Sequence, residues 1–263
     1  MKLRIVTATR GGSEFLPAAF ASIAATAPHA EHVVICPANQ VAEWKKSFPD
    51  RLIVAERDTG LYPALNQGLR EPGEWDAFTW LNDDDLLVGP GFGKLWAEFA
   101  QRPEIGVMYG RVDLIDGKGA RVAGHPIARR GDDLAPLLGR RIVPFAQPGT
   151  VIRREWFERL GGFDASYQLA GDFDFFGRAL LAGAGFAFVD APVACFRLRA
   201  GQLSKRRQEM EAETERALRP FAAQQLGSRA AWWRFRCDNF GLYLDRIRRH
   251  GFRSMREIYD RVE

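Results

Sequence analysis

Residues 76–85 read DAFTWLNDDD, a short apolar run that ends in three consecutive aspartates. A run of this length, rich in large apolar residues, predicts a strand buried on both faces of a sheet. In an open α/β sheet, the carboxyl ends of the strands line the ligand crevice. The stretch therefore predicts both a buried strand and, at Asp83, Asp84 and Asp85, the sheet edge where a site is expected.

The residues before this stretch repeat the same pattern. Apolar runs lie at 2–9, 32–36 and 51–55, and segments with helical spacing lie at 14–26 and 61–69. Ser13 precedes the first helical segment and is predicted to cap it. Short strands that alternate with helices favour a mostly parallel sheet with helices on both faces, so we predict the α/β fold class.

The second half of the chain adds further strands and ends in helices. Residues 106–115 and 119–124 are predicted to pair across Asp116-Gly117, a hairpin turn signal. Strands are also expected at 150–153, 186–189 and 193–198, helices at 155–160 and 172–182, and a short helix or loop at 131–141. From Lys205 onward the pattern is helical, with breaks at Pro220 and Gly227. We therefore predict a domain of residues 1–205 and a helical extension of residues 206–263.

The composition is that of a soluble globular protein. Of 263 residues, 46% are hydrophobic and 27% charged, and no apolar run reaches the roughly 18 residues of a transmembrane helix. The first residues lack the longer apolar stretch of a signal peptide. Cys36, Cys195 and Cys237 are too few and too far apart for a disulfide framework or a zinc site, so each is predicted to be a small buried residue. We expect a cytoplasmic protein.

The acidic triplet has two interpretations. Adjacent carboxylates repel one another unless a cation neutralises them. Mg²⁺ or Mn²⁺ binds through one or two carboxylates together with waters and phosphate oxygens. The alternative is a solvated loop that caps the helix starting near Pro90.

Two further segments place polar residues beside predicted strands and helices. Residues 56–68, ERDTGLYPALNQG, put Asp58 after the third strand and Asn66 on the next helix, although a capped loop with a glycine turn fits equally. Residues 161–178, GGFDASYQLAGDFDFFGR, put Asp172 at or next to a helix N-cap. Backbone N–H groups and the helix dipole keep such a carboxylate ionised, which suits a structural cap and a general base alike.

Taken together and in this order, the three segments resemble the inverting family 2 glycosyltransferases, which have the GT-A fold. Residues 58–68 match the family's DKGIYDAMN-like stretch, residues 81–85 its LNSDD motif, and residues 161–174 its GGFD and DYD block. Phe196-Arg197-Leu198 resembles the family's closing strand. The resemblance covers about residues 1–205 and implies a GT-A sheet flanked by helices, with the extension outside it.

The resemblance implies a role for each matching residue. Asp84, with Asp85 or Asp83 beside it, would hold Mn²⁺ or Mg²⁺ against the donor diphosphate, and the cation would act as a Lewis acid. Asp172 would deprotonate the acceptor hydroxyl as it attacks the anomeric carbon from behind, which inverts the configuration. The implied donor-binding residues are Thr7, Thr9, Asp58, Asn66, Asn82, Asp83 and Arg199.

Three positions depart from the family pattern. Cys36 stands where many relatives carry a base-reading aspartate at the end of the second strand, so the resemblance does not predict uracil as the base. Gln147-Pro148 stands where many have a histidine. Arg199 lies near where some relatives have a metal-binding histidine, and an arginine there could instead bind the diphosphate.

The extension is basic and aromatic. Residues 229–256 hold eight arginines and two aspartates, interleaved with Trp232, Trp233, Phe235, Phe240, Tyr243 and Phe252. Such a helix could lie on an anionic membrane surface at the inner face, which suits a lipid-linked acceptor. The alternative is a helical arm that packs on the catalytic domain or on a second subunit. Nucleic acid is not expected, because no recognition motif is present.

The sequence thus predicts an enzyme that transfers a sugar from a nucleoside-diphosphate sugar to a saccharide or lipid-linked acceptor with inversion, in polysaccharide or lipopolysaccharide biosynthesis. One alternative is a nucleotidyltransferase, which Arg10-Gly11-Gly12 faintly suggests. The other is a non-catalytic nucleotide-sugar or lipid-binding module on a degenerate scaffold, for which Cys36 leaves room. The sequence does not identify the base, the sugar, the acceptor or the oligomeric state.

Overall fold

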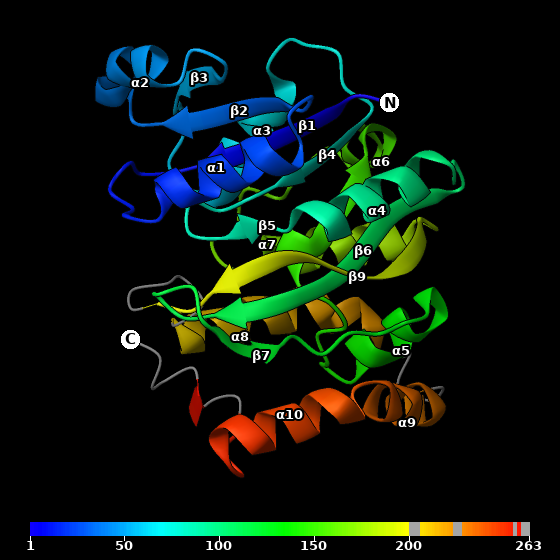
Figure 1. Ribbon diagram of the computed structural model, residues 1–263. Coiled ribbons are helices and arrows are strands. Elements are labelled where there is room, and N and C mark those ends of the chain that lie inside the picture. The colour runs from blue at the N-terminus through cyan, green and yellow to red at the C-terminus, as the bar shows by residue number, and fades with distance from the viewer. Residues whose placement is uncertain (200–205, 223–227, 255–256, 259–263) are drawn as a thin grey trace.

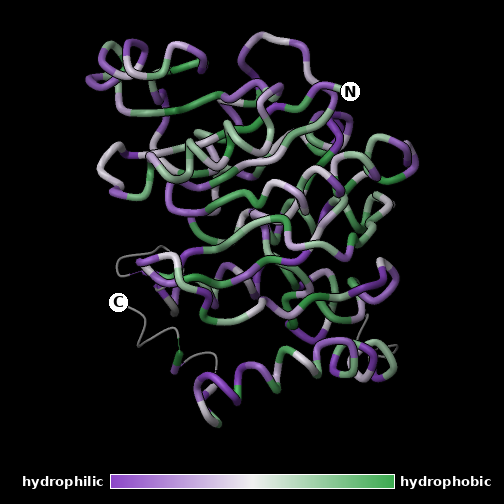
Figure 2. The backbone as a smooth tube through the Cα atoms, in the orientation of Figure 1, coloured by the Kyte–Doolittle hydropathy of each residue, from purple (hydrophilic) through white to green (hydrophobic). Residues whose placement is uncertain are grey.

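The computed structural model describes residues 1–199, 206–222, 228–254 and 257–258 (Figure 1). In this part of the chain, nine strands form one sheet in the order β3-β2-β1-β4-β8-β6-β9-β5, and β7 pairs with β6. Helices pack on both faces of the sheet, and Figure 2 shows hydrophobic positions concentrated along the strands. The predicted α/β fold class is confirmed.

The first half of the chain forms the parallel half of the sheet. Its strands are β1 (Leu3–Ala8), β2 (Glu31–Cys36), β3 (Leu52–Ala55) and β4 (Ala77–Trp80). They pair in parallel, with β1 between β2 and β4. The connecting helices are α1 (Leu16–Thr26), α2 (Val41–Ser47) and α3 (Leu61–Arg70). The four predicted apolar runs are therefore strands whose carboxyl ends meet at one edge.

The second half contributes antiparallel pairs and one long parallel pair. Its strands are β5 (Leu86–Leu87), β6 (Ile105–Ile115), β7 (Arg121–Gly124), β8 (Thr150–Arg153) and β9 (Gly185–Arg197). The predicted β6–β7 hairpin is confirmed, with Asp116 Oδ1 accepting from the Lys118 N–H at 2.9 Å. The prediction of two strands at 186–189 and 193–198 is wrong, because β9 runs unbroken through Pro192. Register shifts opposite Arg111 absorb that proline, which lacks an N–H for the ladder.

The remaining helices cover the sheet or follow it. They are α4 (Gly89–Ala100), α5 (Leu134–Gly139), α6 (Arg154–Arg159), α7 (Gly171–Leu181), α8 (Arg207–Leu218), α9 (Ser228–Asp238) and α10 (Phe240–His250). The extension is helical as predicted, and α8 ends just before Pro220. Gly227, the other predicted break, lies outside the described residues. No helix in the described part is long and apolar enough to cross a bilayer.

Strand alternation builds one apolar layer on each face of the sheet. On β4, Phe78 and Trp80 enter the layer with α3, α6 and α7, whereas Ala77 enters the layer with α1 and α4. The first layer also contains Ala217 of α8 and Phe235 of α9. The core is therefore continuous across the predicted boundary near residue 205.

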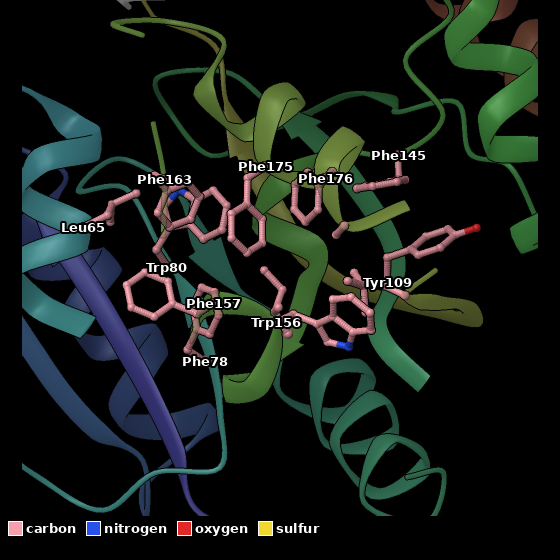
Figure 3. Packing of buried hydrophobic residues seen from close by; sticks show 14 of the residues in the cluster. Leu65, Phe78, Trp80, Tyr109, Phe145, Trp156, Phe157, Phe163, Phe175 and Phe176 are labelled. Atoms are coloured by element: carbon pink, nitrogen blue, oxygen red, sulfur yellow. The ribbon is translucent and has the colours of Figure 1, made fainter. Parts of the chain in front are cut away.

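An aromatic cluster fills the centre of the first layer (Figure 3). The ring centroids of Trp80 and Phe163 lie 5.0 Å apart, and those of Phe163 and Phe175 lie 4.6 Å apart. Phe176 contacts both Trp80 and Phe145. These contacts fix α7, which carries Asp172, against β4, whose end carries the acidic triplet.

Two local predictions are wrong. Ser13 does not cap α1, whose N-cap is Phe15; its hydroxyl instead donates to the Asp83 carbonyl at 3.2 Å, so tertiary contact outweighs the capping preference. Cys237 is exposed, because it lies on the outer face of α9, whereas Cys36 is buried as predicted and Cys195 is partly buried.

Candidate active site

The acidic triplet lies where the ends of β1 and β4 meet. Thr9, just beyond β1, donates from Oγ1 to Asp83 Oδ2 at 2.5 Å. The same Thr9 oxygen accepts from the Gly11 N–H at 3.0 Å. Burial raises the pKa of Asp83 above its ordinary value, and the neighbouring Asp84 charge adds to the rise. Thr9 and Asp83, both predicted to bind the donor, are thus brought together.

The three aspartates have three different environments. Asp83 is partly exposed, whereas Asp84 is 5% exposed and Asp85 is fully buried. Asp85 Oδ1 accepts from the Arg197 N–H at 2.8 Å, and its Oδ2 accepts from the Asn82 amide at 3.3 Å. Burial raises the pKa of Asp85 well above its ordinary value, and the Asp84 charge adds to this. Asp85, predicted as a metal ligand, instead points into the protein, where it binds the Asn82 amide and the Arg197 N–H.

Two arginines at the end of β9 hold the triplet. Arg199 Nε donates to Asp84 Oδ2 at 2.6 Å, in a pair whose arginine side chain is 32% exposed. Arg197, which is buried, donates from Nε to the Asp84 carbonyl at 2.8 Å and from an Nη to the Asp116 carbonyl at 2.9 Å. The sequence analysis assigned no role to Arg197. Its signal was the spacing of two, which puts Arg197 and Arg199 on the same side of the strand end.

The residues fit a shared cation site rather than a cage made by protein alone. No group of three or more His, Cys, Asp or Glu side chains in the described residues is placed to hold a metal ion. Asp83 is partly exposed and Asp84 is 5% exposed beside it. Mg²⁺ or Mn²⁺ commonly needs only one or two carboxylates when phosphate oxygens complete the shell. Arg199 already supplies a positive charge at Asp84, so a cation would have to share that carboxylate with it.

The structure sets two predicted donor-binding residues, Thr7 and Asn66, apart from the triplet. Thr7 is fully buried, with its hydroxyl 3.1 Å from Nε2 of His32. Burial, with Arg51 nearby, lowers the pKa of His32 to about 3, so that ring is neutral. Asn66 is buried and bonded to the backbone of Phe163. Asp58 is exposed beyond the end of β3, on the same sheet edge as the triplet.

Asp172 lies in the first turn of α7, one residue after the first helical position, Gly171. Its Oδ1 accepts from the Phe173 N–H at 2.9 Å and lies 3.4 Å from the Tyr62 hydroxyl. Burial raises the pKa of Asp172 to about 6, against the lowering effect of these hydrogen bonds. A carboxylate with this pKa is ionised at neutral pH yet basic enough to accept a proton, which suits general base catalysis.

Gly171 at the start of α7 allows the backbone of that helix to approach the Tyr62 ring on α3 closely. A Cβ on Gly171 would lie 2.7 Å from the Tyr62 ring, so only glycine fits between α7 and α3. The Tyr62 hydroxyl donates to the Leu169 carbonyl at 3.0 Å. Tyr62 therefore ties the segment after β3 to the segment before α7. Of the residues not predicted, Glu213 of α8 also contacts this segment, through the backbone N–H groups of residues 168–170.

The chain matches no protein-family model, but its fold is found in solved glycosyltransferases. Residues 1–349 of S. aureus TarS, in complex with UDP-GlcNAc, align with a TM-score of 0.63 and 14% identity, over 92% of this chain and 76% of that one. The mannosyltransferase PcManGT from Pyrobaculum calidifontis, in complex with GDP-Man and Mn²⁺, aligns with a TM-score of 0.59 and 16% identity, over 89% of this chain and 73% of that one. At these identities the likeness establishes the fold, and the predicted GT-A fold is confirmed.

One curated relative shares sequence with part of the chain. The O-antigen biosynthesis protein RfbC of Myxococcus xanthus is 30% identical over 125 residues, which cover 42% of this chain and 10% of that protein. The chain therefore matches about a tenth of the length of this relative.

Proposed function

We propose that this chain is an inverting family 2 glycosyltransferase that transfers a sugar from a nucleoside-diphosphate sugar to an acceptor hydroxyl. The observation that carries the proposal is the presence of two distinct carboxylate sites on one GT-A fold. One joins Asp83 and Asp84 to Arg199, and the other presents Asp172 with a pKa of about 6. In the first site, Arg199 and a cation held by the carboxylates would bind a diphosphate. In the second, Asp172 is basic enough to take the proton of an acceptor hydroxyl.

At the donor end, this chain's own residues bind and orient the diphosphate. Arg199 donates to phosphate oxygens while it stays paired with Asp84, and Thr9 and Asn82 hold Asp83 and Asp85 in place. When bound, a divalent cation at Asp83 and Asp84 supplies Lewis-acid neutralisation of the leaving diphosphate. We expect Asp58, which is exposed beyond β3 on the same sheet edge, to contact the nucleoside.

At the acceptor end, Asp172 takes the hydroxyl proton as the acceptor oxygen attacks the anomeric carbon. The new C–O bond forms on the face opposite the bond to the diphosphate, which breaks and leaves its electrons on the phosphate oxygen. The proton ends on Asp172, and the anomeric configuration is inverted. A positioned general base of this kind contributes about 10²–10⁴-fold to the rate.

The comparisons support the proposed substrates and setting. TarS and PcManGT were solved with UDP-GlcNAc and with GDP-Man and Mn²⁺, which favours a nucleoside-diphosphate sugar and a divalent cation here too. RfbC is an O-antigen biosynthesis protein, which favours polysaccharide or lipopolysaccharide assembly as the setting.

A thermal-shift screen of nucleoside diphosphates and nucleotide sugars, with and without Mn²⁺, tests the donor site. A ligand at 100 times its dissociation constant should stabilise the protein by about 2.7 kcal/mol. We expect a cation-dependent shift with one nucleotide that is lost in Asp84→Asn but kept in Asp172→Asn. The matched control is Asp190→Asn, because Asp190 lies on β9 away from both carboxylate sites and is half exposed.

Product analysis separates the alternatives. Release of a nucleoside diphosphate from the nucleotide sugar that binds, together with an inverted glycoside, supports the proposal. Release of pyrophosphate from a nucleoside triphosphate would identify a nucleotidyltransferase instead. Nucleotide-sugar binding without turnover by any tested acceptor would identify a non-catalytic binding module.

We further propose that residues 1–205 carry the chemistry and that the outer face of α9 and α10 contacts an anionic membrane that carries the acceptor. Trp233, Phe240, Leu244 and Phe252 are 61%, 60%, 51% and 93% exposed. Phe240, Leu244 and the exposed Arg248 follow one another at intervals of four on α10, so they share one face. Asp245 is turned inward, onto Arg121 at 2.7 Å, so it does not offset the outward arginine. In Figure 1, α10 lies at the periphery, beyond β7.

Vesicle sedimentation tests this contact, with phosphatidylcholine alone and with added phosphatidylglycerol. We expect binding only to the anionic vesicles, and loss of binding in Phe240→Ser/Leu244→Ser. Leu181→Ser is the control, because Leu181 is equally exposed, at 51%, but lies at the end of α7. Absence of wild-type binding would overturn the membrane contact. A dimer dissociated by the same substitutions would assign this face to a second copy of the chain.

A further inference from the structure

Helix α8 of the extension packs against the segment that carries Asp172. Phe221, just after α8, is fully buried, and its ring would lie 3.1 Å from a Cβ on Gly177 of α7. Arg216 of α8 stacks on the Tyr167 ring at 3.6 Å and donates to Ser166 Oγ at 3.0 Å. These contacts hold α8 over the residues between the Gly161-Gly162 turn and the start of α7.

Glu213, in the middle of α8, binds three consecutive backbone N–H groups of that segment. Its carboxylate accepts from the N–H of Gln168 at 3.0 Å, of Leu169 at 2.8 Å and of Ala170 at 2.9 Å. Although burial acts to raise the pKa of Glu213, these donors outweigh it, and the pKa lies below its ordinary value. The side chain is therefore an ionised anchor for the backbone immediately before α7.

Because Glu213 accepts from the N–H groups before α7, Asp172 is not needed as their acceptor. The first N–H groups of a helix, and those just before it, need acceptors, and an aspartate in the first turn commonly supplies one. Here Glu213 supplies the acceptor for residues 168–170, while Asp172 accepts only through Oδ1. In the described part of the chain, Oδ2 of Asp172 makes no hydrogen bond, so it is available to an incoming hydroxyl.

We infer that Glu213 is a positioning residue, supplied by the C-terminal extension, that fixes the backbone before α7 so that Asp172 faces the acceptor hydroxyl. The inference rests on the proposed transferase function, because it assigns Glu213 a part in that reaction. It also gives α8 a part in catalysis, although the predicted boundary near residue 205 placed that helix outside the catalytic domain. The Glu213 charge, together with burial, helps to raise the pKa of Asp172.

The test compares Glu213→Gln and Glu213→Ala with Glu211→Gln, since Glu211 is an exposed residue of the same helix. We expect Glu213→Gln to lower kcat about ten- to a hundredfold with an unchanged KM for the donor, because the base is displaced while the donor site is intact. The acidic limb of the pH–rate profile should move to lower pH, because a negative charge near Asp172 has been removed. Hydrogen exchange at the amides of 168–170 should speed up in both Glu213 variants and not in Glu211→Gln.

Three outcomes would overturn parts of this account separately. An active wild-type enzyme whose kcat, pH profile and amide exchange are all unchanged in Glu213→Gln would overturn the positioning role alone. A wild-type protein without any transfer activity would overturn the proposed function, and with it the catalytic role of Glu213. Faster exchange in Glu213→Ala accompanied by the same kcat would also overturn positioning, because it would show that the anchor is structural only.

Discussion

The Asn66 carboxamide on α3 binds both backbone polar groups of Phe163. Its Nδ2 donates to the Phe163 carbonyl at 2.8 Å, and its Oδ1 accepts from the Phe163 N–H at 2.9 Å. Gly162, at φ +89°, leaves room for this contact, since a Cβ there would lie 2.6 Å from Asn66 Oδ1. One buried side chain thereby joins the segment after β3 to the glycine turn before α7.

Replacement of Asn66 by alanine should therefore destabilise the fold rather than weaken donor binding. Two buried backbone groups would lose their partners, which costs about 1–3 kcal/mol for each group left unsatisfied. Urea unfolding measures the loss, and Asn39→Ala, at an exposed position, is the control. If Asn66→Ala had normal stability but lower donor affinity, the result would contradict the structural role and support Asn66 as a donor-binding residue.

Asp172→Asn should lower kcat by about 10²–10⁴-fold and leave donor binding intact, because asparagine cannot accept the proton. In the wild type, kcat/KM should fall about tenfold per pH unit below the Asp172 pKa of about 6, as the base becomes protonated. A pH–rate profile with no acidic limb near this value would contradict Asp172 as the base.

The same substitution has a stability signature. The folded-state pKa of Asp172, about 6, lies above the ordinary value of 3.8. The folded protein therefore binds more protons than the unfolded chain in that window, so ionisation of Asp172 costs stability as pH rises through it. Asp172→Asn should be more stable than wild type above about pH 6, and the difference should disappear below 3.8. Thermal unfolding across this pH range measures the difference.

Arg199→Met should weaken nucleoside-diphosphate binding about tenfold or more, because a charged hydrogen bond to phosphate is lost. The substitution also frees Asp84 for a cation, so Mn²⁺ titrated alone should bind more tightly than to wild type. Calorimetric titration of Mn²⁺ and of the diphosphate measures the two effects separately. Equal Mn²⁺ affinity in the two proteins would show that Arg199 and the cation do not compete for Asp84.

Arg4→Met should destabilise the protein by about 1–3 kcal/mol, because backbone carbonyls bound by the buried guanidinium lose their donor, while the partner Glu31 is 34% exposed. Arg4 is fully buried, pairs with Glu31 at 2.7 Å and donates to the Glu71 carbonyl at 2.7 Å. Denaturant unfolding measures the change, with Arg102→Met as the control because the Arg102 side chain is 44% exposed. An equal loss of unfolding free energy in both variants would show that the Arg4 contacts stabilise the fold no more than those of an exposed arginine.

Local patterns predicted the parallel half of the sheet well, because each strand there is short, apolar and bounded by helical spacing. They failed at β9, where the two predicted strands, 186–189 and 193–198, are one strand that accommodates Pro192 by register shifts opposite Arg111. They also failed at Ser13, which is not the N-cap of α1: its hydroxyl donates to the Asp83 carbonyl and accepts from the Phe15 N–H. In both cases a partner distant in sequence decides the local conformation.

The sequence by itself determined the four parallel strands and the sheet edge where the acidic residues gather, because hydrophobic periodicity is a property of the chain. Through the order of its motifs it also indicated the GT-A fold. It did not determine which of three adjacent aspartates faces solvent, because burial depends on what packs against each one. Only the tertiary structure paired Asp84 with Arg199, turned Asp85 onto the Arg197 N–H and placed Glu213 before α7. These contacts join residues more than forty positions apart, and no local pattern encodes such distances.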